Sequence, residues 1–371
     1  MNKEPMFHMS KRESITLGKR IMIYVAAILL ALIVCAAVIV GLVHMNPLGV
    51  YKAIFDGALG SSRRIWITIR DTLVLLCIAV GLAPAFKMRF WNIGAEGQVL
   101  IGGVVSAACM IYLSDKVPNV VLILLMLAGS AIGGLIWGLI PTFFKAHWNT
   151  NETLFTLMMN YVAMQVVTFC ICFWENPKGS NSVGIINQAT QAGWLPELFG
   201  QKYGWNVLIV LILTVGMFIY LKYCKQGYEI AVVGESENTA RYAGIHVKKV
   251  IIRTMAISGA ICGIGGAYCS MIINGGVWLR DSVGGLGWIS VALVIFAAWK
   301  PINVIYGSFI FGALRVLKYY VPKNTYAIPT AFFDALPFII TALVLVIASM
   351  RKNKGAHIPA HLGENYFREE R

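Results

Sequence analysis

The sequence predicts an all-α membrane protein, a polytopic bundle of about ten transmembrane helices with a glycine-broken helix in each half. Apolar residues make up 58% of the 371 residues and charged residues only 13%, with a mean hydropathy of +0.71. Several apolar runs reach the roughly 20 residues that an α-helix needs to cross a bilayer. A soluble chain of this length would carry far more charge. Polar segments that contain glycine open two of the apolar runs, one in each half.

The predicted spans follow one another along the chain, so we expect residues 1–371 to form a single transmembrane domain. The first apolar run is too long for the core of a signal peptide and is expected to remain as a span. The ten spans are Ile21–Val43, Ile65–Phe86, Asn92–Leu113, Val120–Phe144, Thr153–Phe173, Asn206–Tyr223, Val250–Ile273, Trp288–Trp299, Val304–Leu317 and Asp334–Met350. A short interfacial helix is expected at Val50–Ala58, before the second span.

Basic residues decide the expected orientation. The net charge is +14, but most Lys and Arg residues flank apolar runs and do not gather on one helix face with aromatic residues. This distribution indicates membrane topology and argues against nucleic-acid binding. The positive-inside rule makes residues 1–20 a cytoplasmic N-terminal segment and residues 351–371 a cytoplasmic tail. It makes 174–205 an external loop and 222–249 a cytoplasmic loop.

The eight cysteines lie within or beside apolar runs, where cysteine packs as a small hydrophobic residue. Cys170 and Cys172 have no matching second pair, so we expect no metal site there.

Asn92, Glu96 and Gln98 interrupt two long apolar runs. Polar and charged groups in such a position are costly, so they mark a functional site by default. Neighbouring glycines predict a broken helix, which is tolerated at membrane depth only where it lines a cavity or is buried in protein. We expect Asn92 to cap the third span and Glu96 to lie in its first turn, where negative charge is favourable.

Two roles remain open for Glu96 at this stage. It is either a group of the transport pathway or gate, or a residue that caps its own helix and pairs with a neighbour such as Arg89.

The second polar break lies at Gly284–Ser290, after a glycine-rich stretch. Paired interruptions in two halves of a membrane protein point to a pathway near the midplane. Trp288 either belongs to an aromatic belt or stacks on a flat base. The candidate pathway residues are Asn92, Glu96, Gln98, Asn160 and Trp288. Their polar but largely uncharged character suits a neutral, hydrogen-bonding solute.

The predicted cytoplasmic loop contains a short helix. Ser236 is placed to cap a helix over Glu237–Tyr242, which Gly244 would end. Such a helix is either a docking element for a cytoplasmic partner or a solvated connector.

Several motifs resemble those of known transport proteins. Glu229, Ala231 and Gly234 are similar to the coupling-loop signature of bacterial ABC importer permeases, and Asn92–Gln98 resembles the signature of the ribose and branched-chain amino-acid permease superfamily. Three segments resemble its nucleoside branch, whose binding proteins are basic-membrane-protein lipoproteins: Asn151–Tyr161, Arg241–Ile245 and Leu362–Arg371.

This resemblance implies the permease subunit of an ATP-driven importer in a bacterial plasma membrane, with nucleosides as substrates. The implied partners are a second homologous permease subunit, a cytoplasmic ATPase and an external substrate-binding lipoprotein. The residues implied in ATPase docking are Glu229, Gly234, Glu235, Glu237, Asn238, Arg241 and Gly244. No cofactor is expected in this chain; ATP and Mg²⁺ would bind the partner ATPase.

The sequence lacks the common motifs of nucleotide binding and of hydrolytic catalysis. The sequence contains no G-x-x-x-x-G-K-[S/T] loop, no H-E-x-x-H motif and no recognisable Ser/His/Asp arrangement. We therefore expect a transport subunit and not an enzyme. The alternatives are an importer permease for sugars or branched-chain amino acids, and a secondary transporter driven by an ion gradient, with Glu96 as its ion site.

Overall fold

The computed structural model describes residues 46–273, 275–279, 281–297 and 301–320, with isolated positions between 22 and 40 and between 335 and 342. Across these residues the regular secondary structure is helical, with isolated β-bridges but no strand. The predicted spans Ile21–Val43 and Asp334–Met350 lie almost entirely outside the described residues. Helix α2 (Pro47–Leu59), at the predicted interfacial helix, belongs mainly to a first unit, residues 1–57 and 320–327. The helices from α3 onward belong to a second unit.

Six described helices are long and apolar enough to cross a bilayer. They are α3 (Ser62–Lys87), α4 (Ala95–Leu113), α5 (Asn119–Trp148), α6 (Glu152–Trp174), α7 (Gly204–Tyr223) and α10 (Val247–Tyr268), which continues as the π-helix η2 (Cys269–Ile273). Two shorter apolar helices follow, α11 (Leu286–Phe296) and α12 (Pro301–Tyr320). These eight overlap eight of the predicted spans, so the expected count of about ten is not confirmed within the described ranges.

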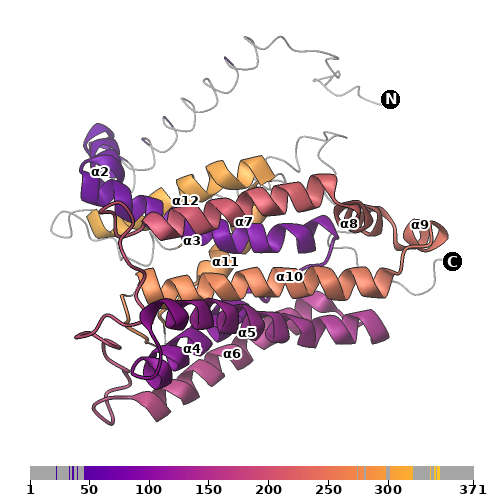
Figure 1. Ribbon diagram of the computed structural model, residues 1–371. Helices are drawn as coiled ribbons and strands as arrows, with labels where there is room; N and C mark the ends of the chain where they lie inside the picture. Colours follow the sequence, from indigo (N-terminus) through magenta and orange to yellow (C-terminus); the bar gives the residue numbers. More distant parts are fainter. Residues whose placement is uncertain are drawn as a thin grey trace. The chain divides into compact units, whose positions relative to one another are not determined.

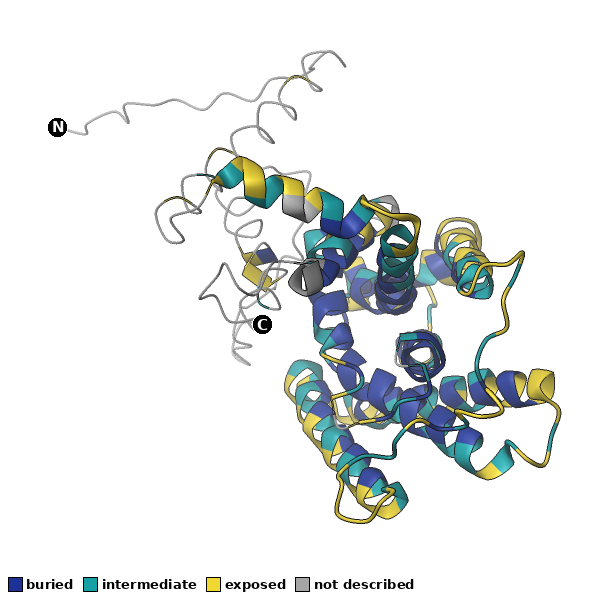
Figure 2. Cartoon of the chain, turned by 90° about the vertical axis from the view of Figure 1, so that its left-hand side faces the viewer, coloured by how far each residue is buried: buried dark blue, intermediate teal, exposed yellow. Residues whose placement is uncertain are grey.

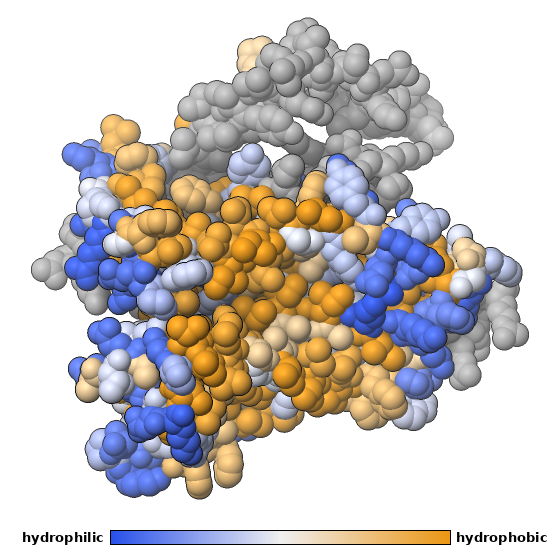
Figure 3. All heavy atoms as spheres, viewed as in Figure 1, coloured by the Kyte–Doolittle hydropathy of each residue, from blue (hydrophilic) through white to orange (hydrophobic). Residues whose placement is uncertain are grey.

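The long helices of the second unit run side by side, and the short helices α8 and α9 lie at one end of them (Figure 1). Hydrophobic side chains cover the middle of the face in Figure 3, whereas hydrophilic side chains gather at its two ends. This pattern is the one that a bilayer imposes, because lipid surrounds the middle and water meets the ends. The protein is therefore a multi-pass membrane protein.

Helix α10 is the most deeply buried of the six long helices in the described ranges. It packs against α5 and α4 through small residues, because a methyl group on Gly134 of α5 or on Gly102 of α4 would overlap the backbone of α10. Small residues allow such close backbone approach where no hydrophobic effect drives helices together. Seen along the helices, buried residues gather toward the middle of the bundle and exposed residues on its outer faces (Figure 2).

The predicted external loop is irregular in structure, with turns and bridges between the end of α6 and the start of α7. Its Ile186 amide donates to the carbonyl of Gly276, and its Trp194 indole donates to the carbonyl of Ile186. The first bond, together with the bridge between Ile185 and Val277, ties the loop to the segment that follows η2, whereas the second lies within the loop. That segment returns into the bundle, and α11 begins at its end.

Two local predictions need correction. Helix α4 begins at Ala95 with Gly94 at the N-cap, and Asn92 does not cap it because its amide is bonded elsewhere. The predicted 222–249 loop contains a further helix, α8 (Lys225–Glu235), besides the expected short one. Ile230 and Val233 bury one face of α8, and this packing stabilises a helix that the loop's polar composition did not indicate.

Candidate functional site

Helix α4 begins inside the bundle. The Gly97 amide donates to Asn160 Oδ1 over 2.8 Å, and Asn160 Nδ2 donates to the Ile93 carbonyl over 2.9 Å. Asn160 lies about 12 Å along α6 from its first residue, at 1.5 Å rise per residue. The start of α4 is therefore roughly two turns deeper than the start of α6. Asn160, a predicted pathway residue, is fully buried and acts here as a positioning residue.

Asn92 and Gln98 form a reciprocal amide pair. Asn92 Nδ2 donates to Gln98 Oε1 over 3.2 Å, and Gln98 Nε2 donates to Asn92 Oδ1 over 3.1 Å. Asn92 Nδ2 also lies 3.3 Å from Ser258 Oγ on α10. Both amides are buried, so they satisfy one another and fix the irregular backbone before α4. The structure brings these two predicted pathway residues together, but their side chains bond to each other and to α10 and so hold α4 against α10.

The two predicted breaks meet at Glu96. Its Oε2 accepts the backbone N–H of Gly287 in the first turn of α11 over 2.7 Å. Gly287 packs so closely that a Cβ on it would overlap the backbone of Glu96. The positive ends of two helix dipoles therefore converge on one carboxylate, which is a favourable arrangement for a buried charge.

One of the two roles expected for Glu96 was to cap its own helix and to pair with Arg89, and this geometry corrects it. The carboxylate caps α11 and not its own helix. It does not pair with Arg89, whose guanidinium lies 3.5 Å from the carbonyl oxygen of Glu235.

A cavity of about 360 Å³ lies beside this contact, and we call it the junction cavity. Its lining residues are Glu96, Leu100, Met164, Gln165, Asp281, Val283 and Gly284. They come from α4, α6 and the segment that leads into α11. Of the predicted pathway residues, only Glu96 lines this cavity. Trp288 is half-buried in the first turn of α11 and is not among the lining residues.

Sequence reasoning missed Gln165 and Asp281, the other polar residues of the junction cavity. Both are exposed, although Gln165 lies in the middle of an apolar helix. An exposed amide there faces a water-filled route or a partner, since lipid would not solvate it. The available signal was the position of Gln165, little more than one turn beyond Asn160 on α6.

The second region of interest is α9 (Glu237–Tyr242), where the predicted short helix is confirmed with its bounds. Ser236 Oγ accepts the Thr239 amide over 3.2 Å, and Gly244 ends the segment with φ +74°. Buried Ala240 anchors the helix, and its carbonyl accepts the Ile245 amide.

The predicted docking residues separate into two groups. Glu229 is bonded to Arg253 of α10 over 2.8 Å, and Gly234 packs against the end of α3 at Lys87, so these two hold α8 in place. The exposed members are Glu235, Glu237, Asn238, Arg241 and Gly244. Sequence reasoning did not single out Tyr242, whose side chain projects from the end of α9 with 93% of the residue exposed.

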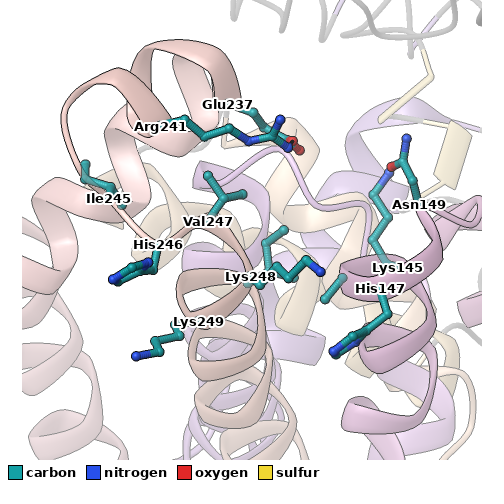
Figure 4. Close-up of a pocket in the computed structure, with 12 residues that line it drawn as sticks. Lys145, His147, Asn149, Glu237, Arg241, Ile245, His246, Val247, Lys248 and Lys249 are labelled. Carbon is teal, nitrogen blue, oxygen red and sulfur yellow. Dashed lines mark hydrogen bonds and ion pairs between the residues drawn. The ribbon is translucent and has the colours of Figure 1, made fainter.

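Two adjoining cavities of about 680 and 670 Å³ lie beside α9 and share Lys145, Asn149, Glu237, Arg241 and Ile251. Figure 4 shows the first, with side chains arriving from the end of α5, from α9 and from the start of α10. Glu237 and Arg241 lie within 3.4 Å of each other, and Lys145 pairs with Glu152 over 2.9 Å. Lys248 extends from α10 on the side of α5, whereas Lys249 points away (Figure 4). This end of the bundle therefore presents a polar, mainly basic groove behind an exposed helix.

The described residues contain no group of three or more His, Cys, Asp or Glu side chains arranged to hold a metal ion.

Comparison with known proteins agrees with this architecture. Residues 65–345 match the family model described as branched-chain amino acid transport system / permease component. The chain is similar to the nucleoside ABC transporter permease protein NupB of Lactococcus lactis subsp. cremoris, with 27% identity over 81% of this chain and 86% of the relative. It is similar to the guanosine ABC transporter permease protein NupP of Bacillus subtilis, with 25% identity over 81% and 85%.

A third relative is named for a different substrate. The glucose ABC transporter permease protein TsgB13 of Haloferax volcanii is 23% identical over 87% of this chain and 85% of its own. The family model covers most of the chain and includes α4, α9 and α11, the three elements that build the two regions above. The chain therefore belongs to the family of permease components of branched-chain amino acid transport systems.

Proposed function

We propose that this chain is the transmembrane permease subunit of an ATP-driven nucleoside importer in a bacterial plasma membrane, with both termini in the cytoplasm. The junction of α4 and α11 carries the proposal. Two helices that begin within the bundle, meet at a buried carboxylate and border a cavity with both polar and apolar lining residues form the kind of broken-helix site that membrane transporters use near the midplane.

The lining of the junction cavity supports a neutral solute. Gln165 offers both donors and acceptors, and Asp281 offers acceptors, beside the apolar Leu100, Met164 and Val283. A nucleoside has a flat apolar base face and several hydroxyl and amide-like groups, which match this mixture. The Lactococcus and Bacillus relatives are named as nucleoside and guanosine permeases, which agrees with a nucleoside substrate. The Haloferax relative is named as a glucose permease, so glucose is the competing candidate.

The exposed face of α9 supports docking of a separate ATPase. Five of the residues implied in docking lie on or beside this helix and are exposed. Tyr242 adds a large aromatic anchor, a residue type enriched among interface hot spots. The sequence contains no P-loop, so ATP and Mg²⁺ would bind the ATPase subunit and not this chain.

The full importer would contain a second, homologous permease subunit and an external substrate-binding lipoprotein. The junction cavity is open beside the exposed Gln165 and Asp281, and a second permease would close this side. An ion-gradient mechanism is less well supported, because Glu96, its expected ion site, already accepts a hydrogen bond from the N-terminus of α11.

Uptake by proteoliposomes tests the function. The vesicles would contain this chain with its genomic neighbours: the ATPase, the second permease and the binding lipoprotein. We expect ATP-dependent accumulation of a labelled nucleoside, and none of labelled glucose or leucine. Accumulation of glucose or leucine in place of nucleosides would overturn the substrate assignment. Uptake driven by an ion gradient without ATP would overturn the energy source.

Tyr242→Ala should weaken docking of the ATPase and reduce substrate-stimulated ATP hydrolysis. Truncating an aromatic hot spot costs about 2 kcal/mol of binding, or roughly 30-fold in affinity. The double variant Glu237→Ala/Arg241→Ala should also reduce stimulated hydrolysis, since it removes both charges from the exposed face of α9. The measurements are ATPase pull-down on the purified permeases and hydrolysis rates in proteoliposomes.

Phe199→Ala is the matched control, because Phe199 is 95% exposed in the loop between α6 and α7, at the opposite end of the bundle. It should leave ATPase binding unchanged. If the Tyr242 variant bound ATPase as tightly as the control, α9 would not be the docking element.

A further inference from the structure

Arg315 is a buried arginine for which the described residues supply no ion-pair partner. It lies on the inward face of α12 with Ser308 and Phe311 and retains only 8% of its accessible surface. Among the described residues, its Nη1 has no hydrogen-bond acceptor. A guanidinium is rarely placed in a membrane bundle without an anion or carbonyl, and by default such a residue marks a functional site.

The second observation is the place of this guanidinium. Arg315 Nη2 lies 3.6 Å from where a Cβ on Gly284 would stand, and Gly284 lines the junction cavity. Gly284 has φ +57°, which favours glycine, so the cavity wall carries no side chain at this point. The Arg315 head group is thus next to the cavity that Glu96, Gln165 and Asp281 line.

The Asp281 carboxylate and the Arg315 guanidinium both lie near Gly284 but do not form an ion pair with each other. Asp281 belongs to the same turn, since its carbonyl accepts the Gly284 amide over 3.1 Å, yet no ion pair links its carboxylate to Arg315. The described charges at the cavity are therefore two carboxylates, Glu96 and Asp281, and one guanidinium. This balance disfavours an anionic ligand such as a phosphate ester and favours a neutral ligand with both acceptors and donors.

A guanidinium presents parallel N–H donors and pairs best with two adjacent acceptors. Among nucleobases, a 6-oxopurine offers that pair along one edge, at O6 and N7, whereas adenine offers N7 beside a 6-amino donor. We propose that Arg315 is a specificity-determining residue of this pathway, which donates to O6 and N7 of a 6-oxopurine nucleoside held against Gly284. This inference rests on the proposed nucleoside import and narrows it to one class of base.

Competition uptake by the complete importer in proteoliposomes tests the proposal. Labelled guanosine would be mixed in turn with adenosine and with 7-deazaguanosine, which lacks the N7 acceptor. Wild type should prefer guanosine to adenosine by roughly 5- to 150-fold, the range for one bidentate contact, and should also prefer it to 7-deazaguanosine. Arg315→Gln should abolish both preferences, and Arg315→Lys should retain part of them, because Lys supplies a charge without the planar fork.

Arg70→Gln is the matched control, since Arg70 is also an arginine of the bundle, half-buried, but is bonded to the buried Asp71 over 2.8 Å. It should lower uptake of all nucleosides alike and leave the preferences intact. The ratios within one vesicle preparation do not depend on how much permease inserts correctly. If Arg315→Gln did not assemble, the 7-deazaguanosine comparison in wild type and in Arg315→Lys would still test the contact.

Two results would overturn the proposal. One is a wild-type importer that takes up guanosine and 7-deazaguanosine equally well. The other is an Arg315→Gln variant with reduced uptake but unchanged preferences, which would make the arginine a structural residue. Both differ from failure of the proposed function, in which the wild-type importer would carry no nucleoside at all.

Discussion

We expect Gly287→Ala to lower the free energy of unfolding by about 3 kcal/mol, which is the upper end of the usual cost of overpacking, and to abolish most transport. The added methyl group would overlap the backbone of Glu96 and lie 2.8 Å from the Ala95 carbonyl carbon. Backbone on both sides cannot move aside as a flexible side chain can, so α4 and α11 must separate. Thermal unfolding in detergent and uptake rates in proteoliposomes measure the two effects.

Gly216→Ala is the control for Gly287. Gly216 also lies in a membrane-spanning helix, α7, but a Cβ there would meet no atom within 4 Å. We expect its stability and uptake to match or slightly exceed those of wild type, since alanine has the higher helix propensity. A Gly287 variant as stable and active as this control would show that the two helix starts do not pack so closely.

Glu96→Ala should destabilise the protein by about 3 kcal/mol, because it leaves the Gly287 amide without its charged acceptor in a buried site. Glu96→Gln should cost less, about 1 to 2 kcal/mol, because an amide oxygen can still accept the bond but carries no charge for the two helix dipoles. Uptake should decline in the same order. Thermal unfolding and ATP-driven nucleoside uptake, measured on the three proteins in parallel, check this order.

Glu197→Gln is the control for Glu96, because Glu197 is an exposed carboxylate in the loop between α6 and α7. Neutralising it should change stability by no more than about 0.5 kcal/mol. The opposite order, in which Glu96→Gln is worse than Glu96→Ala, would show that the carboxylate does not act by capping α11.

The sequence alone predicts the helical architecture well, because a bilayer leaves a chain few alternatives. Apolar runs of sufficient length become helices, and eight of the predicted spans coincide with helices in the described ranges. The short helix after Ser236 was also predictable residue by residue, since capping depends on neighbours only a few positions away. Likewise, glycine and polar residues within apolar runs located both breaks correctly.

The roles of the individual polar residues were less predictable. Three of these residues, Asn92, Gln98 and Asn160, are polar residues in an apolar context. That pattern is typical both of a transport pathway and of a buried hydrogen-bond network that holds helices together. Composition cannot separate the two, because the difference lies in whether a partner amide or carbonyl is within reach. In the structure each of these three has its partners, whereas Gln165 and Asp281 face the cavity.

The sequence by itself determined that this is a membrane-spanning helical protein, where its helices break, and where its short exposed helix begins and ends. The tertiary structure decided that the two breaks meet, that Glu96 caps a helix from the other half of the chain, and that Arg315 lies beside the resulting cavity. The physical reason is the range of the interactions. Hydrophobicity and capping act within one segment, whereas the Glu96–Gly287 bond joins residues 191 positions apart. Because lipid and protein interior are equally apolar, the pattern of a spanning helix does not reveal which face meets a neighbour.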